Sequence, residues 1–219
     1  MEQKEYWERY GEAFTDLYER PTWFNRVFRH AIFLRAEQTI EAVRRTPGAT
    51  VLDVGCGNGR NAVLLIKAAG ASRVVGVDLA EDMIERARQV AEQHGVADRC
   101  TFLRQDFLTA DLGDEVFDYS VALGVLDYFR DPTNLLTKMR RHTRYEALAS
   151  IPGSSSIRMV LRKARYMVRG LGVYWFTPEQ INKMFRDAGF AECRIEPCAA
   201  TGWMAHGVVQ EPPDEQKDT

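Results

Sequence analysis

The chain has 219 residues, of which 45% are hydrophobic and 27% are charged, and its net charge is −2. This length and composition indicate one α/β domain, and the near-neutral charge gives no sign of a nucleic-acid partner. The polar start and the lack of an apolar run of about 18 residues predict neither a signal peptide nor a membrane span. The four cysteines show no C-x-x-C spacing, which is typical of a reduced cytoplasmic protein.

Residues 1–45 are expected to form helices that precede the sheet. Large apolar side chains recur there every three or four residues, which places them on one helical face: Tyr6, Tyr10, Phe14 and Leu17. Pro21 interrupts the pattern, and a second helix is expected from Trp23 onward. The simplest interpretation of both stripes is packing against the core.

A buried strand at residues 51–54 leads into a loop with glycine at every second position, Gly55, Gly57 and Gly59. Glycine tolerates positive φ and lets a ligand approach bare backbone, and the helix predicted over residues 58–69 directs free N–H groups into this loop. The dinucleotide fingerprint G-x-G-x-x-G would need a small residue where Arg60 stands, and no Gly-Lys-Ser/Thr of a P-loop follows. The spacing is therefore G-x-G-x-G.

Three predicted strands in succession end in an acidic residue. Asp53 ends the first, Asp78 follows the strand at residues 73–77, and Asp106 follows the strand at residues 100–105. Ligands of open α/β sheets bind at these carboxyl ends. A carboxylate at Asp78 can bind both hydroxyls of a ribose, and Asp106 with Phe107 can contact an adenine. We therefore expect a nucleoside-containing ligand.

The rest of the chain continues the alternation of strands and helices. Its predicted elements are a helix at 81–93, a strand at 116–123, a helix at 131–141, a strand at 145–151, an additional helix at 153–170, a helix at 177–188 and closing strands at 194–197 and 203–209. Thr177-Pro178-Glu179 has the chemistry of a helix start. Residues 211–219 form a polar tail that is expected to be disordered.

The glycine spacing and the three strand-terminal acids resemble the class I S-adenosylmethionine-dependent methyltransferases, most clearly over residues 50–130. This resemblance implies an α/β fold with a Rossmann-like seven-stranded sheet and helices on both faces. It also implies one methyltransferase domain over residues 1–210, with a helical lid at 1–45 and an inserted cap helix within 150–176. The cofactor would be S-adenosyl-L-methionine, and the expected reaction is in-line displacement that methylates a small-molecule acceptor.

The resemblance also assigns candidate site residues. Those expected to bind the cofactor are Tyr10, Asp53, Gly55, Gly57, Gly59, Asp78, Leu79, Met83, Asp106, Phe107 and Leu123. Tyr10 would do so from the lid, and Leu79 with Met83 would enclose the adenine, although Met83 fits a core position equally well. Candidates for a general base are Asp127, His142, Tyr174 and His206, although each can also be a structural side chain. No metal site is expected.

Other features bear on the acceptor. Residues 123–126 read Leu-Gly-Val-Leu and not Asn/Asp-Pro-Pro-aromatic, which disfavours the amino-methylating enzymes of DNA and many of RNA. The segment 150–176 is similar to the acceptor cap of small-molecule methyltransferases, including those acting on porphyrin or quinone precursors. Four arginines of this segment form a basic stripe along one helical face: Arg158, Arg162, Arg165 and Arg169. Three interpretations of the stripe stay open, namely a solvated face, a surface that binds nucleic acid or an anionic membrane, and a surface that guides or binds an anionic acceptor.

Two other classes of function are compatible with a Rossmann-like fold. One is an NAD(P)-dependent oxidoreductase, against which Arg60 and the late Asp106 count. The other is a non-catalytic S-adenosylmethionine-binding partner subunit. The sequence leaves the oligomeric state and the methylated atom open.

Overall fold

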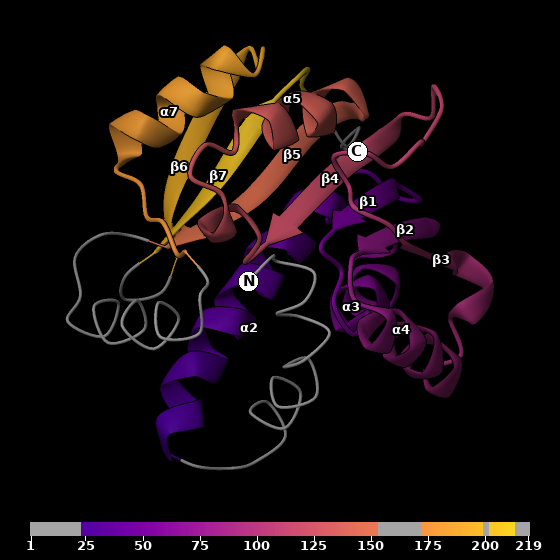
Figure 1. Ribbon diagram of the computed structural model, residues 1–219. Coiled ribbons are helices and arrows are strands. Elements are labelled where there is room, and N and C mark those ends of the chain that lie inside the picture. The colour runs from indigo at the N-terminus through magenta and orange to yellow at the C-terminus, as the bar shows by residue number, and fades with distance from the viewer. Residues whose placement is uncertain (1–22, 153–171, 199–201, 213–219) are drawn as a thin grey trace, which may run out of the picture.

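A computed structural model describes residues 23–152, 172–198 and 202–212 of the chain. Its centre is a seven-stranded sheet in the order β3-β2-β1-β4-β5-β7-β6 (Figure 1). The strands are β1 (Thr50–Val54), β2 (Arg73–Asp78), β3 (Cys100–Arg104), β4 (Phe117–Leu123), β5 (Thr143–Pro152), β6 (Glu192–Cys198) and β7 (Gly202–Val208). This arrangement confirms the Rossmann-like seven-stranded fold expected from the sequence.

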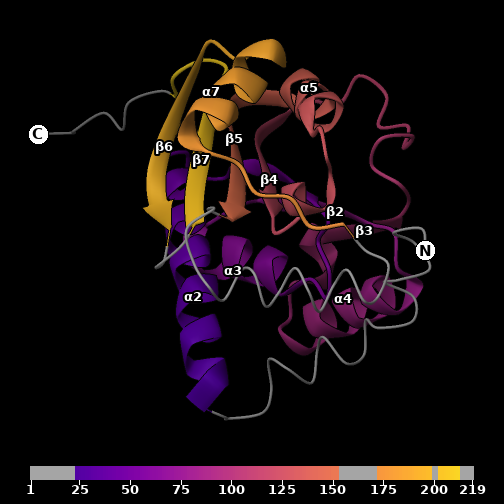
Figure 2. The same cartoon turned by 60° about the vertical axis from the view of Figure 1, so that its left-hand side comes forward.

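Helices cover both faces of the sheet, as Figures 1 and 2 show from two directions. One face carries α2 (Trp23–Arg44), α3 (Arg60–Ala69) and α4 (Glu81–Gln93), and the other carries α5 (Thr133–Arg141) and α7 (Pro178–Asp187). Two short 3₁₀ turns, η1 (Ala97–Arg99) and η2 (Leu126–Tyr128), complete the described elements. Strands β1 to β5 are mutually parallel, so they all end at one edge of the sheet.

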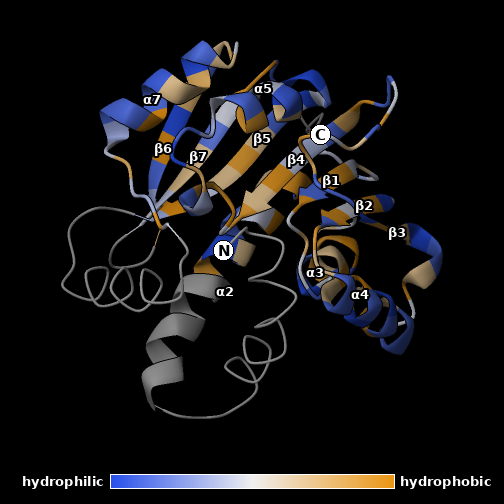
Figure 3. Ribbon diagram, viewed as in Figure 1, coloured by the Kyte–Doolittle hydropathy of each residue, from blue (hydrophilic) through white to orange (hydrophobic). Residues whose placement is uncertain are grey.

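Each face of the sheet has its own hydrophobic core. Leu52 and Val54 of β1 point into the core under α5 and α7, whereas Val51 points into the core under α2, α3 and α4. A parallel strand covered on both faces is apolar along its length, which is why β1 and β2 read as nearly continuous hydrophobic runs. Figure 3 shows hydrophobic residues dominating the central strands, while α4 and α7 carry hydrophilic residues along much of their length.

Strand β7 enters the sheet between β5 and β6 and runs antiparallel to both, and these last two strands correspond to the closing strands predicted at 194–197 and 203–209. Helix α7 begins with a capping box, because the Thr177 hydroxyl accepts from the Gln180 N–H and the Gln180 side chain accepts from the Thr177 N–H. The predicted fifth strand is longer than expected and begins at Thr143.

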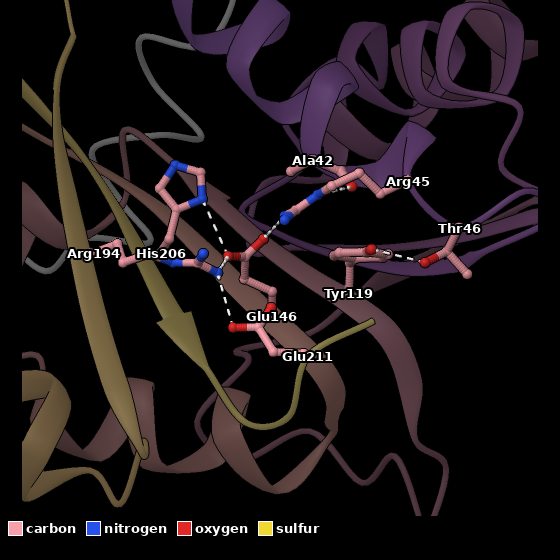
Figure 4. A network of polar contacts seen from close by, with 8 residues as sticks. All are labelled: Ala42, Arg45, Thr46, Tyr119, Glu146, Arg194, His206 and Glu211. Carbon is pink, nitrogen blue, oxygen red and sulfur yellow. Dashed lines mark hydrogen bonds and ion pairs between the residues drawn. The ribbon is translucent and has the colours of Figure 1, made fainter. Parts of the chain in front are cut away.

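A buried acid joins the antiparallel strands to the end of α2 (Figure 4). The Glu146 side chain is only 2% exposed and pairs with Arg45, with Arg194 at 2.9 Å and with Nδ1 of His206 at 3.5 Å. Burial alone would raise the pKa of Glu146. The hydrogen bond and charge of His206, together with both arginines, outweigh that effect and lower the pKa. Glu146 therefore holds three strands and the α2–β1 connection together.

Several sequence predictions fall on residues outside the described ranges. These are the first lid helix with Tyr10, the cap helix at 153–170 with its basic stripe, and most of the polar tail. Within the described ranges, no helix is both long enough and apolar enough to cross a membrane. The same part of the chain contains no cluster of three or more side chains able to hold a metal ion.

Candidate cofactor and acceptor site

The predicted site residues gather where the parallel strands end. Asp53 lies within β1 near its end, Asp78 ends β2, and Leu123 ends β4. Asp106 follows β3 by two residues. The registers of these parallel pairs bring the four strand ends to one edge, so residues far apart in sequence become neighbours.

The three glycines of the loop all have positive φ but differ in the space around them. A Cβ on Gly55 would lie 2.4 Å from Cγ2 of Val125, and one on Gly59 would lie 2.8 Å from Cβ of Ala87. These two positions therefore need glycine for close packing as well as for their backbone conformation. A Cβ on Gly57 would meet nothing within 4 Å, so Gly57 borders open space at φ 51°. The bare backbone at Gly57 is thus the part of the loop that a ligand can approach.

The Asp78 carboxylate organises this loop from the neighbouring strand. Its Oδ2 accepts from the Gly57 N–H at 2.8 Å, and its Oδ1 accepts from the Ala80 N–H at 3.0 Å. Burial raises the pKa of Asp78, and these backbone hydrogen bonds oppose the rise. Each carboxylate oxygen has a second lone pair, so Asp78 can still accept hydrogen bonds from a ligand.

Asp53 is the most perturbed acid of the site. It is 2% exposed, and burial raises its pKa to about 7, with the hydrogen bond from Asn61 opposing the rise and the charge of Asp78 adding to it. The Asn61 amide nitrogen donates to Oδ2 of Asp53 at 3.3 Å. Oδ1 of Asn61 is buried and receives no hydrogen bond from the described residues. A buried carboxyl and an unused amide oxygen together suit a ligand that is cationic and a hydrogen-bond donor.

Sequence reasoning did not find Asn61. It lies in the first turn of α3, directly after Arg60, and that turn faces the end of β1. The only local signal was its place just beyond the glycine loop, which is shared by many residues that face solvent.

The residues expected around the adenine lie in two settings. Leu79 is half-buried at the open edge, and Met83 is 5% exposed at the start of α4. Asp106 is exposed, and its side chain accepts from the Leu108 N–H at 2.9 Å. The Phe107 ring packs in the core under α5 and α7, where Nζ of Lys138 lies 5.1 Å from its centroid. A role of the Phe107 ring toward adenine stays a prediction.

Two of the candidate bases lie together beyond β4. Asp127 is 1% exposed in η2, and its carbonyl oxygen accepts from the Tyr174 N–H at 2.8 Å. The segment that leads into α7 is thereby attached to the end of β4. Gly124, just after β4, is fixed in turn by a 2.8 Å hydrogen bond from its N–H to the Ser150 hydroxyl.

The two histidines lie elsewhere. His142 follows α5, and its carbonyl oxygen accepts from the Phe117 N–H at the start of β4, so it lies at the amino edge of the sheet. Its Nδ1 is 2.7 Å from the carbonyl oxygen of Glu115. Because α5 runs antiparallel to the strands, its last residue returns to the edge opposite Asp127. His206 lies within β7 beside Glu146. Both histidines are thus distant from the carboxyl ends of the parallel strands, where the predicted cofactor-binding residues lie.

Comparison with known proteins identifies the class. A family model described as a methyltransferase domain matches residues 45–165, more than half of the chain. The chain therefore belongs to this methyltransferase family, and its seven-stranded sheet has the fold of the class I S-adenosylmethionine-dependent methyltransferases. The match sets aside the nicotinamide-dependent alternative.

Individual relatives agree with this class. The chain is 30% identical over 144 residues to a sterol 24-C-methyltransferase of Gibberella zeae, covering 61% of this chain and 37% of that protein. It is 31% identical over 127 residues to a trans-aconitate 2-methyltransferase of Azoarcus, covering 57% and 47%. The chain thus spans less than half the length of these curated relatives.

Among solved structures, magnesium protoporphyrin IX methyltransferase from Synechocystis, with bound S-adenosylhomocysteine, superimposes with a TM-score of 0.76. The match covers 94% of this chain and 97% of that one at 21% sequence identity. The likeness extends over the whole fold.

Proposed function

We propose that the protein methylates a small-molecule acceptor at the edge of the sheet where β4 ends. The observation that carries the proposal is the combination of open backbone at Gly57 with the buried carboxyl of Asp53 and the buried Oδ1 of Asn61 beside it. The names of three relatives support a small acceptor, since they refer to a sterol, trans-aconitate and a porphyrin. The four cysteines form no disulfide bonds, which is compatible with the reducing environment of the cytoplasm.

The arrangement fits S-adenosylmethionine, which supplies a methyl group made electrophilic by its sulfonium. Asp53 and Oδ1 of Asn61 would receive its cationic amino-acid end, and Asp78 would bind the ribose hydroxyls. Leu79 and Met83 would enclose the adenine, and Asp106 would accept from its amino group. Gly57 leaves space for this ligand, while Gly55 and Gly59 keep the loop closely packed.

The acceptor would lie on the far side of Leu123 and Gly124 from α4. There the protein must orient a nucleophile in line with the bond that breaks, and a hydroxyl or amine must also lose a proton. Asp127 and Tyr174 would take that proton, which is supported by the backbone hydrogen bond that joins them just beyond β4. A carboxylate acceptor would need no base. His142 is not proposed for this role, because it lies at the opposite edge.

The test follows the transferred methyl group. The purified chain is incubated with methyl-labelled S-adenosylmethionine and a cell extract separated by size into small molecules and macromolecules. Label should accumulate in the small-molecule fraction, and the Asp127→Asn and Tyr174→Phe variants should show whether either side chain is needed for turnover. Transfer only to protein or nucleic acid would show that the proposed acceptor class is wrong.

A further inference from the structure

Arg35 of α2 lies at the same edge of the sheet as the cofactor loop. Its Nη1 is 3.7 Å from the position of a Cβ on Gly124, the residue that directly follows β4. Its guanidinium also lies close to the thiol of Cys198, the last residue of β6, where it opposes the rise that burial causes in the pKa of that thiol. Cys198 pairs with Gly202, which pairs with Pro152 at the end of β5, so both contacts of Arg35 are at the carboxyl edge.

The charge of Arg35 has no carboxylate partner among the described residues. Other arginines beside the sheet are paired, as Arg45 and Arg194 are with Glu146. Glu196 of β6, two residues before Cys198, accepts a hydrogen bond from Gln38 of α2 at 3.3 Å. Within the described ranges this half-buried guanidinium meets no anion that would compensate its lost hydration, so it is a candidate binding group for one.

The position of Arg35 indicates which anion it would meet. Val125 packs against Gly55 of the cofactor loop, which places the loop on one side of the segment after β4. Arg35 lies beside the same segment at Gly124 and also close to the end of β6, on the side away from β1 and β2. It therefore lies on the side of the methyl-transfer edge that the acceptor would occupy.

We propose that Arg35 binds a carboxylate of the methyl acceptor and so selects anionic acceptors. This inference rests on the proposed function and adds a recognition residue to it. A guanidinium offers two parallel N–H donors that match the two oxygens of a carboxylate, which fixes orientation as well as charge. Because Gly124 has no side chain, no atom of this residue stands between the guanidinium and the end of β4, which leaves room for the carboxylate of the acceptor.

The test measures binding of matched acids and amides to protein saturated with S-adenosylhomocysteine. The probes are para-hydroxycinnamate, octanoate and protoporphyrin IX, each titrated by calorimetry beside its neutral amide. The variants are Arg35→Gln, Arg35→Lys and the control Arg44→Gln, which changes an arginine of the same helix that donates to the Ala68 carbonyl.

Wild type and the control Arg44→Gln should each bind at least one of the acids about tenfold or more tightly than the matching amide, as expected for a charge-assisted contact. Arg35→Gln should remove this preference, and Arg35→Lys should retain part of it, with unchanged affinity for S-adenosylhomocysteine. The proposal is overturned if no acid is preferred by wild type, or if Arg35→Gln keeps the preference. It is also overturned if Arg35→Gln weakens S-adenosylhomocysteine instead, because Arg35 would then serve the cofactor. Failure of the proposed function is recognised separately, by label transferred only to macromolecules.

Discussion

Asp53 should couple cofactor binding to the loss of a proton. Burial raises its pKa from 3.8 to about 7, which corresponds to about 4 kcal/mol in favour of the neutral acid in the free protein. A cationic ligand favours the carboxylate and moves the pKa back down. Below pH 7, binding must therefore release the proton from Asp53, and the affinity for S-adenosylmethionine should fall as the pH falls.

The size of the effect follows from the pKa. With a pKa of about 7, Asp53 is mostly ionised at pH 8 and mostly neutral at pH 6. The affinity should decrease about tenfold between these pH values, because each pH unit below the pKa costs about 1.4 kcal/mol. Calorimetry in buffers of different ionisation enthalpy should show nearly one proton released near pH 6 and almost none at pH 8.

Asp53→Asn provides the matched control, because it keeps the shape and removes the titration. The amino group of the ligand titrates in both proteins, so the difference between their pH profiles isolates Asp53. The variant should bind more weakly at pH 8. The empty variant should also become more stable relative to wild type as the pH rises from 3.8 toward 7, because over this range unfolded wild type ionises Asp53 while the folded protein keeps it protonated. Identical pH profiles for the two proteins would refute the role of Asp53.

Three further predictions test the site and the fold. Asp78→Asn should weaken S-adenosylmethionine binding about tenfold or more in calorimetry, since hydrogen bonds to a charged acceptor are the stronger kind, whereas the exposed control Asp98→Asn should not. Gly57→Ala and Gly70→Ala should each cost about 1–2 kcal/mol of stability in urea unfolding through positive φ, but only Gly57→Ala should also weaken cofactor binding. Glu146→Gln should lower the free energy of unfolding by about 2 kcal/mol near neutral pH, a value discounted because the arginine partners of Glu146 are 40% exposed. Unfolding measured at lower pH should show a smaller difference between variant and wild type as the pH approaches the lowered pKa of Glu146.

Each of these three predictions has an outcome that contradicts it. Unchanged affinity in Asp78→Asn would show that the ribose is bound elsewhere. Equal losses of affinity in the two glycine variants would mean that Gly57 acts only through backbone strain. A stability difference for Glu146→Gln that stays constant at low pH would mean that charge pairing is not what Glu146 contributes.

Much of the fold could be predicted from the chain because its signals are local. Continuous apolar runs indicate strands covered on both faces, and the glycines of the loop stand where positive φ is needed. The capping residues of α7 also lie next to each other in sequence. The acids at the ends of β1 and β2 could be placed at one edge because parallel strands end together.

The roles of other residues depend on contacts between distant parts of the chain, which no local pattern reports. His142 lies at the edge opposite the site because α5 returns to the amino edge, and the Phe107 ring packs in a core where Lys138 lies over it. Asn61 gains a role only because the first turn of α3 faces Asp53. Arg35 looks like an ordinary polar residue of a helix until α2 crosses the sheet and brings its charge between the ends of β4 and β6. Sequence periodicity determines which face of an element is buried, whereas the packing of elements against one another decides which charges meet.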